Sequence, residues 1–140
     1  NADYSWSWSG KNFYGFAEIY RNGFGVTASA DYLAPPAALS ARLARGELFV
    51  MARHYAAFGA QVEMTPLVTL GVSLIANRDD GSRLWQGRLD WSLAQNLTLQ
   101  TGAQLPDGRN GSEYGGLPTA TPGVTLGAGR SAWLRLAQYF

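Results

Sequence analysis

Apolar and polar residues alternate along the segment 83–95. The odd-numbered positions of this segment hold Trp85, Gly87, Leu89, Trp91 and Leu93, and the even-numbered positions hold Gln86, Arg88, Asp90 and Ser92. Successive side chains of a β-strand point to opposite faces of its sheet, so a period of two indicates a strand. The segment is therefore predicted to be a strand with one apolar and one polar face.

The same alternation recurs along most of the chain. Asn96 marks a tight turn into the next alternating run, and Asp79-Asp80-Gly81-Ser82 is a strong hairpin signal before residue 83. In the run Glu47–Met64 the alternation is regular in the second half and less regular in the first half. Strands are expected at 4–9, 13–21, 47–64, 68–77, 83–95, 97–105 and 131–140. The predicted fold class is all-β and antiparallel, as a single domain over residues 1–140.

The connections between these strands alternate in length. Short turns are expected at Gly10–Asn12, Thr65–Leu67 and Gln95–Asn96, and longer connections at Asn22–Gly46, Asp79–Ser82 and Pro106–Arg130. Outer-membrane β-barrels have short periplasmic turns and longer outer loops. The pattern predicts a transmembrane β-barrel whose last residue, Phe140, lies at the periplasmic end.

The composition agrees with a chain whose surface meets something other than water. Charged residues are 15% of the chain, against about 25% in a typical soluble domain. The net charge of +1 and the absence of long charge runs make nucleic acid an unexpected partner. With no cysteine and one histidine, disulfides and thiolate or His-cluster metal sites are excluded, and no cofactor or metal is expected.

The number of strands leaves two interpretations open. Bacterial single-chain barrels have an even number of strands, and the count here is seven. The chain is then seven strands of a larger barrel whose remaining strands lie elsewhere. Alternatively, Phe24–Tyr32 is an eighth strand after an Asn22-Gly23 hairpin and closes an eight-stranded barrel. The first interpretation is preferred because Pro35-Pro36 and a helix-like Leu39–Leu43 segment are typical of an outer loop.

The last segment, Trp133-Leu134-Arg135-Leu136-Ala137-Gln138-Tyr139-Phe140, resembles the C-terminal β-signal of bacterial outer-membrane proteins. Residues that match this signal are Ala132, Leu134, Leu136 and Phe140. More loosely, the segments 13–23 and 45–49 look like the closing third of porin-like barrels from proteobacteria. The resemblance implies localisation in the bacterial outer membrane. It also implies outer-membrane lipid and the barrel-assembly machinery as partners.

Charged residues on the strands are expected to face the lumen, because Arg or Lys on the lipid face costs about 2–4 kcal/mol near the midplane. The candidate lumen-lining residues are Glu18, Arg53, Glu63, Arg88, Asp90 and Arg135. They either select small solutes in a pore or pair across strands and fill the interior. The expected function is a pore or transport barrel for small polar solutes, narrowed by the loops 22–46 and 106–130. The alternative is a non-conducting barrel segment that acts as an assembly or folding substrate in a larger complex.

Two other classes of protein share features with this sequence. His54 invites comparison with outer-membrane lipid hydrolases, but no Ser flanks it, and Glu63 lies about 30 Å along the same strand. We therefore expect no enzymatic activity. A soluble sandwich or lipocalin-like barrel has the same alternation with its faces exchanged. A membrane barrel is favoured over a soluble one by the low content of charged residues, by the tryptophans at apolar positions and by the terminal strand.

Overall fold

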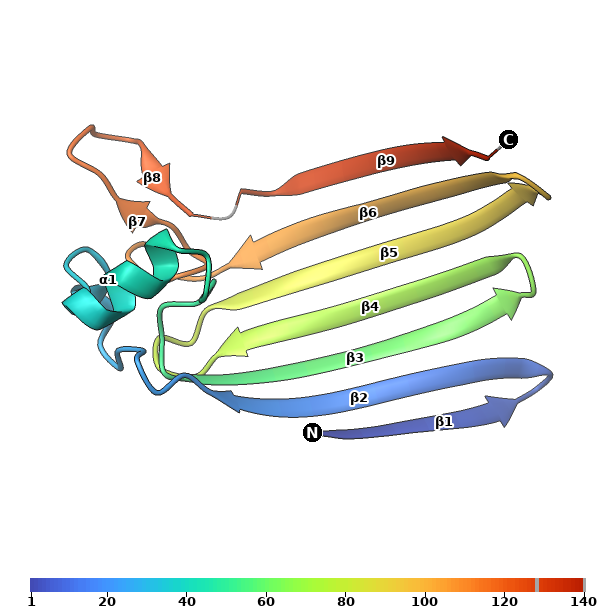
Figure 1. Ribbon diagram of the computed structural model, residues 1–140, viewed down its shortest axis with the longest axis horizontal. Helices are drawn as coiled ribbons and strands as arrows, with labels where there is room; N and C mark the ends of the chain where they lie inside the picture. The colour runs from blue at the N-terminus through green and yellow to red at the C-terminus, as the bar shows by residue number, and fades with distance from the viewer. Residues whose placement is uncertain (128, 140) are drawn as a thin grey trace.

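A computed structural model describes residues 1–127 and 129–139 of the chain. Its main feature is one antiparallel sheet of seven strands whose spatial order follows the chain (Figure 1). The strands are β1 (Ala2–Trp8), β2 (Lys11–Arg21), β3 (His54–Thr65), β4 (Val68–Asn77), β5 (Arg83–Ala94), β6 (Leu97–Asp107) and β9 (Ser131–Gln138). This confirms the predicted all-β antiparallel class. The sheet is open, with β1 and β9 as its two edges.

The two ends of the sheet differ as the sequence predicted. Tight turns join β1 to β2, β3 to β4 and β5 to β6 at one end, and the longer connections gather at the other (Figure 1). Ser9 and Gly10 form the first turn with φ angles of 53° and 74°, and positive φ at both central residues suits a two-residue hairpin. The amide of Tyr139 bonds the carbonyl of Asn96 at 2.9 Å. The described end of the chain therefore lies beside a tight turn, while Phe140 is outside the described residues.

The predicted eighth strand at Phe24–Tyr32 is wrong. Val26 forms only an isolated bridge to Ala52, and residues Ser29–Tyr32 form the 3-10 helix η1. Tyr32 is buried, and its hydroxyl accepts a hydrogen bond from Asn77 at 3.0 Å. The segment is bent because this aromatic side chain packs under the loops instead of extending the sheet.

Other parts of the long connections also have structure of their own. The helix α1 (Ala37–Ala44) begins directly after Pro36 and contains the helix-like 39–43 segment. A short hairpin of β7 (Leu117–Pro118) and β8 (Thr125–Leu126) lies within the connection from β6 to β9. The first half of the expected strand 47–64 is wrong. The strand begins only at His54, and residues 47–53 belong to the loops.

The strand register divides the sheet into two chemically different faces. Cross-strand partners lie on the same face, so each row can be followed from β1 to β9. On one face, called the polar face, a row is formed by Ser7, Asn12, Glu63, Thr69, Asp90, Gln100 and Arg135. On the other, called the apolar face, a row is formed by Trp6, Phe13, Val62, Leu70, Leu89, Thr101 and Leu134.

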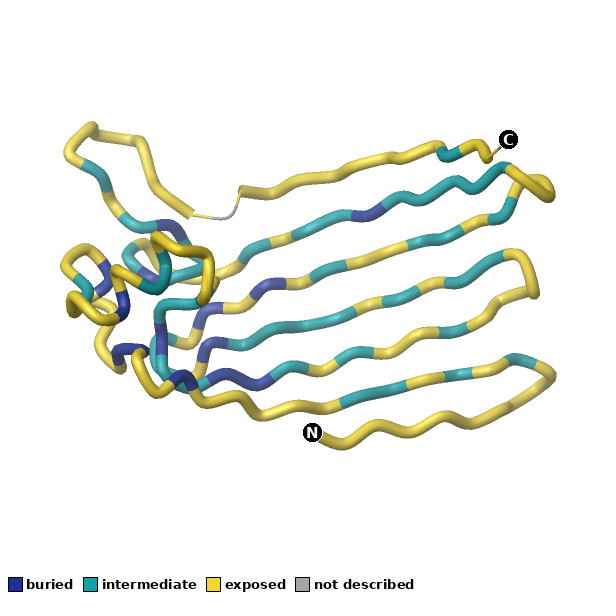
Figure 2. Tube along the Cα trace, in the orientation of Figure 1, coloured by how far each residue is buried: buried dark blue, intermediate teal, exposed yellow. Residues whose placement is uncertain are grey.

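The buried core lies at the loop end and not along the sheet (Figure 2). It consists of Val26, Tyr32, Leu39, Ala52 and Tyr55, with several partly buried loop residues packed against it. Along the rest of the sheet both faces are largely uncovered. The chain exposes 9356 Å², whereas a compact soluble protein of this mass exposes about 7,100 Å². The sheet has no second layer within the described residues.

Candidate functional site

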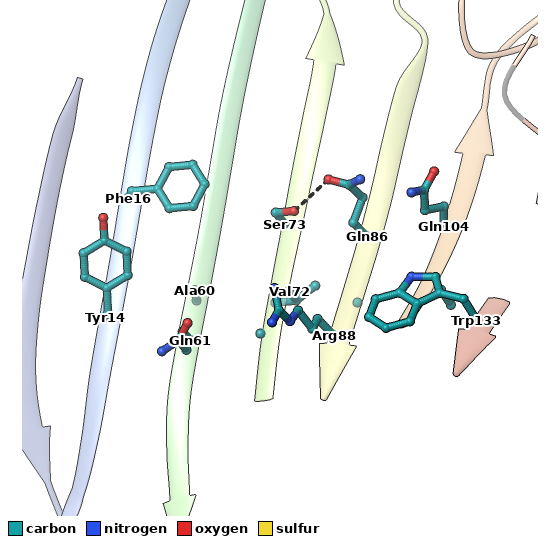
Figure 3. Close-up of a pocket in the computed structure, with 13 residues that line it drawn as sticks. Tyr14, Phe16, Ala60, Gln61, Val72, Ser73, Gln86, Arg88, Gln104 and Trp133 are labelled. Carbon is teal, nitrogen blue, oxygen red and sulfur yellow. Dashed lines mark hydrogen bonds between the residues drawn. The ribbon is translucent and has the colours of Figure 1, made fainter. Parts of the chain in front are cut away.

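A hollow lies on the polar face near the middle of the sheet (Figure 3). It is lined by side chains from β2, β3, β4, β5, β6 and β9, so the whole width of the sheet except β1 contributes. The labelled side chains that carry its chemistry are Tyr14, Phe16, Gln61, Ser73, Gln86, Arg88, Gln104 and Trp133. Their place follows from strand parity, because each occupies a polar-face position of its strand.

Two aromatic rings of the hollow lie across glycines on the neighbouring strand. Phe16 is paired with Gly59, and Trp133 is paired with Gly102. A Cβ atom built at Gly59 would lie 2.3 Å from the Phe16 ring, and one at Gly102 would lie 2.7 Å from the Trp133 ring. Only glycine leaves room for these rings. The rings are thereby held against the wall of the sheet.

Among the described residues that line the hollow, the one charged side chain is Arg88, which is paired with a carboxylate beside it. The Arg88 guanidinium contacts both carboxylate oxygens of Asp90, with Nε–Oδ2 at 2.7 Å and Nη2–Oδ1 at 2.8 Å. Gln100 donates to Asp90 Oδ1 at 2.7 Å. This two-point geometry fixes the direction of the guanidinium plane. The Ser73 hydroxyl donates to Gln86 at 3.3 Å.

A second polar network lies on the same face nearer the tight turns. The Ser7 hydroxyl donates to Asn12 Oδ1 at 2.8 Å, and Asn12 Nδ2 donates to Glu63 at 2.7 Å. These hydrogen bonds link β1, β2 and β3 through side chains, in addition to the backbone pairing. It holds the carboxylate of Glu63 on the polar face.

The structure places five of the six expected lumen-lining residues on the polar face. These are Glu18, Glu63, Arg88, Asp90 and Arg135. Arg53 differs, because it lies just before β3 and its Nε donates to the Gly25 carbonyl at 3.0 Å. Its side chain therefore ties one loop to the sheet. The three apolar β-signal residues, Ala132, Leu134 and Leu136, lie on the apolar face of β9.

A partly buried carboxylate at the loop end was not found from the sequence. Glu113, in the connection between β6 and β9, accepts hydrogen bonds from the Tyr55 hydroxyl, from Asn77 Nδ2 at 2.8 Å and from the Met51 amide at 2.8 Å. Tyr55 also accepts from the Ala52 amide at 2.7 Å. Glu113 thus joins the 106–130 loop to β3, β4 and the segment before β3.

The β4–β5 turn completes this network. Asp80 accepts from the amides of Ser82 and Glu113, each at 2.8 Å. Asp79 accepts from the amides of Arg53 and His54, each at 2.8 Å. The Asp79 carboxylate also contacts the His54 ring, with Nδ1–Oδ1 at 2.9 Å. The two acidic turn residues therefore bind two different loops to the sheet.

Two partly buried carboxylates at the loop end, Glu113 and Asp79, have opposite pKa shifts. Burial raises the pKa of Glu113 above its ordinary value, although hydrogen bonds from Tyr55, Met51 and Asn77 act in the other direction. Burial also raises the pKa of Asp79, but hydrogen bonds from the His54 ring and from backbone amides outweigh it and leave this pKa below its ordinary value. Hydrogen bonds from donors favour the charged form, and desolvation favours the neutral form.

His54 has an orienting carboxylate that sequence reasoning did not identify. The Asp79 contact fixes the ring through Nδ1. In the residues that the structure describes, no serine, threonine or tyrosine hydroxyl is hydrogen-bonded to the ring. The pair anchors the β4–β5 turn, and the absence of enzymatic activity stays a prediction.

Comparison with protein-family models, with curated proteins and with solved structures finds no match to this chain. Across residues 1–127 and 129–139, no helix is long and apolar enough to cross a membrane. In the same residues, no three His, Asp or Glu side chains are grouped to hold a metal ion.

Proposed function

We propose that this chain forms a wall of a bacterial outer-membrane β-barrel that passes small polar solutes. One observation carries the proposal. The register collects most of the charged and amide side chains on one face and most of the aromatic and aliphatic side chains on the other, and away from the loop end no second layer of the described residues covers either face. In this arrangement the apolar face meets lipid and the polar face lines the passage.

The exposed apolar side chains favour lipid over water. Side chains that are 40% or more exposed on this face include Trp6, Trp8, Phe58, Leu70, Val72, Trp85, Trp91, Leu105, Leu134 and Leu136. An apolar surface this continuous marks a protein or membrane contact in soluble proteins. Strands β2 to β6 have 10 to 12 residues, and about 9–11 residues of tilted strand span a bilayer.

The two ends of the apolar face carry groups suited to the lipid headgroup region. Trp91 lies near the tight turns, and Trp85 lies toward the loop end. Arg21 and Arg83 are exposed at the loop end of the same face, and Lys11 lies at the tight-turn end. Aromatic and cationic side chains at both borders of an apolar band are typical of membrane barrels and of snorkelling residues. This supports outer-membrane lipid as the partner of the apolar face.

The long loops are positioned to narrow the passage. Tyr55 and Ile75 have polar-face parity, and both pack with the loop core. Leu84, which is paired with Ile75, is also buried. The loops therefore cover the polar side of the sheet at one end and leave the apolar side exposed. A loop that folds toward the lumen restricts the size of the solutes that enter.

The direction in which each face points can be tested with two single-tryptophan variants. One keeps Trp85 on the apolar face and the other keeps Trp133 on the polar face, with the remaining tryptophans replaced by Phe. In phosphatidylcholine vesicles with brominated acyl chains, we expect strong quenching of Trp85 and little quenching of Trp133. Aqueous iodide should quench Trp133 more than Trp85. Equal quenching of the two by bromine would overturn the assignment of the faces.

Passage of solutes is tested by conductance across planar bilayers. A pore predicts discrete single-channel steps, and replacement of Arg88 and Asp90 by Gln and Asn should shift the reversal potential in a salt gradient. Thr101, on the apolar face, supplies the control variant Thr101→Val, which should leave the reversal potential unchanged. An unchanged reversal potential in the double variant would remove this pair from the pore lining.

The open edges favour a second candidate function, a non-conducting barrel segment that serves as an assembly substrate or as part of a larger complex. β1 and β9 run in the same direction and have no partner on their outer sides within the described residues. Bilayer contact by Trp85 without conductance steps would support this candidate. Migration of the detergent-folded chain as a compact, heat-modifiable species would instead show that it closes without a partner.

Recognition of β9 by the barrel-assembly machinery belongs to both candidates. Leu134 and Leu136 are 70% and 60% exposed on the apolar face, as a segment presented for recognition requires. Replacing both by Ser should slow assembly into vesicles that contain the machinery more than assembly into detergent. Equal slowing in both media would assign these residues to stability alone.

A further inference from the structure

The uncharged polar groups of the polar-face hollow are suited to a solute rich in hydroxyl groups. Gln61, Gln86 and Gln104 line the hollow from three different strands (Figure 3). Gln61 and Gln104 take part in none of the side-chain hydrogen bonds found in the described residues, and Gln86 has one, to Ser73. An amide offers two N–H donors and one carbonyl acceptor. Hydroxyl groups can therefore replace water at each of these side chains.

The charge balance of the hollow disfavours an ionic solute. Arg88 is the one charged side chain in the described lining, and Asp90 already occupies its guanidinium through two contacts. An anion would have to compete with this carboxylate. A cation would find no unpaired carboxylate in the described lining. The hollow therefore favours a neutral solute.

Aromatic rings lie toward both ends of the hollow, with Gln86 between them. Tyr14 and Phe16 lie toward β2, and Trp133 lies toward β9 (Figure 3). Tyr14 is 37% exposed and Trp133 is 40% exposed, on the face that otherwise carries polar groups. Because Phe16 and Trp133 each lie across a glycine, one side of the ring packs on the sheet and the other is open to the hollow.

A saccharide combines the features that this lining would recognise. The C–H groups on one side of a sugar ring pack against the electron-rich face of an aromatic ring, and the hydroxyl groups at its edge bond amides. The hollow extends across the strands from β2 to β9, which is five inter-strand spacings of roughly 4.8 Å, or about 24 Å. That width accommodates more than one sugar ring.

We infer that the hollow is a binding site for a neutral saccharide and that the solutes passed by the barrel are of this class. The transport part of this inference rests on the proposed function. The binding part depends only on the lining of the hollow, so the two can be tested separately.

Binding is measured in the variant that keeps Trp133 as its only tryptophan, folded in a zwitterionic detergent without a sugar headgroup. Titration with maltotriose should change the Trp133 emission saturably, with a Kd in the millimolar range. Triethylene glycol, which has oxygen atoms but no ring, should give no saturable change. Lactobionate, a charged saccharide, should bind at least fivefold more weakly than maltotriose.

Variants in the same background separate recognition from folding. Gln86→Leu and Gln104→Leu should each weaken maltotriose binding at least threefold. The matched control is Gln138→Leu, which removes an exposed amide from the apolar face and should leave binding unchanged. Unaltered circular dichroism in all three shows that the sheet has folded.

The outcomes distinguish this inference from the proposed function. Absence of a saturable response, or equal affinities in Gln86→Leu and Gln138→Leu, overturns the saccharide site. The bromine quenching of Trp85 is a separate measurement. If it fails while maltotriose binds, the membrane assignment falls and the saccharide site stands. If it succeeds while maltotriose does not bind, the saccharide site falls and the membrane assignment stands.

Discussion

Removing the partly buried carboxylate of Glu113 should release the loops from the end of the sheet. Glu113→Ala leaves the Met51 amide, the Tyr55 hydroxyl and one N–H of Asn77 without their acceptor. A buried donor that loses its partner costs about 1–3 kcal/mol. Because Glu113 is only partly buried, water satisfies some of these donors, and the lower figure applies to each. The expected loss is about 3 kcal/mol of loop anchoring.

Glu113→Gln should have a smaller effect for a geometric reason. One carboxylate oxygen accepts from Met51, and the other accepts from both Tyr55 and Asn77. An amide has one oxygen, so its NH₂ group must face either the Met51 amide or Asn77, and both of these are donors. One hydrogen bond is then replaced by a donor–donor contact, while the burial of a charge is relieved.

Hydrogen exchange followed by mass spectrometry measures this anchoring in the detergent-folded chain. A change of 3 kcal/mol corresponds to roughly a hundredfold faster exchange, expected in peptides that cover residues 48–53 and 111–118. The matched control is Glu47→Ala, whose exposed carboxylate pairs with Arg42 and Arg45 and should contribute little. If Glu113→Ala accelerates exchange no more than Glu47→Ala, the carboxylate does not anchor the loops.

Three further predictions concern pH, packing and lipid contact. Burial in the folded state raises the pKa of Glu113, so loop anchoring should weaken as pH rises from the ordinary carboxyl pKa of 4.5 through the raised value. Below pH 4.5 the titration of Glu113 should not change the anchoring. Glu113→Gln should abolish this pH dependence in exchange rates that are corrected for the intrinsic effect of pH on amide exchange. Gly59→Ala should destabilise the sheet by about 1–3 kcal/mol, because the new methyl group overlaps the Phe16 ring, and a urea midpoint equal to that of the unsubstituted chain would contradict it. Replacing Arg21 and Arg83 by Gln should weaken association with vesicles of anionic phospholipid, but not with phosphatidylcholine vesicles, in a flotation assay; equal weakening on both would show that these side chains do not contact headgroups.

Strand positions were predictable because the alternation of side chains is a local property of the chain. Trp85, Leu89 and Trp91 share a face whatever lies around them, since neighbouring residues of a strand must point to opposite sides. The charged pair of Arg88 and Asp90 follows from the same rule, because residues two apart on one strand lie on one face. Five of the six expected lumen residues reached the polar face for this reason.

The loop end was not predictable because its contacts join distant parts of the chain. Glu113 is 58 residues from Tyr55 and 36 from Asn77, and no local pattern marks it as buried. The same packing bends the segment at Tyr32, which alternation alone indicated as a strand. Arg53 continues the polar parity of β3, but its amide donates a hydrogen bond to Asp79 and its guanidinium donates one to the Gly25 carbonyl, and these bonds hold it in the loops.

The direction of the two edge strands limits what can complete the wall. An odd number of antiparallel strands begins and ends in the same direction, so β1 and β9 both run toward the tight turns. Joining them directly would create a parallel pair. A second copy inserted in the same orientation would also meet each edge with a parallel strand. An antiparallel barrel therefore needs an odd number of further strands between β9 and β1, and one strand running toward the loop end is the smallest solution.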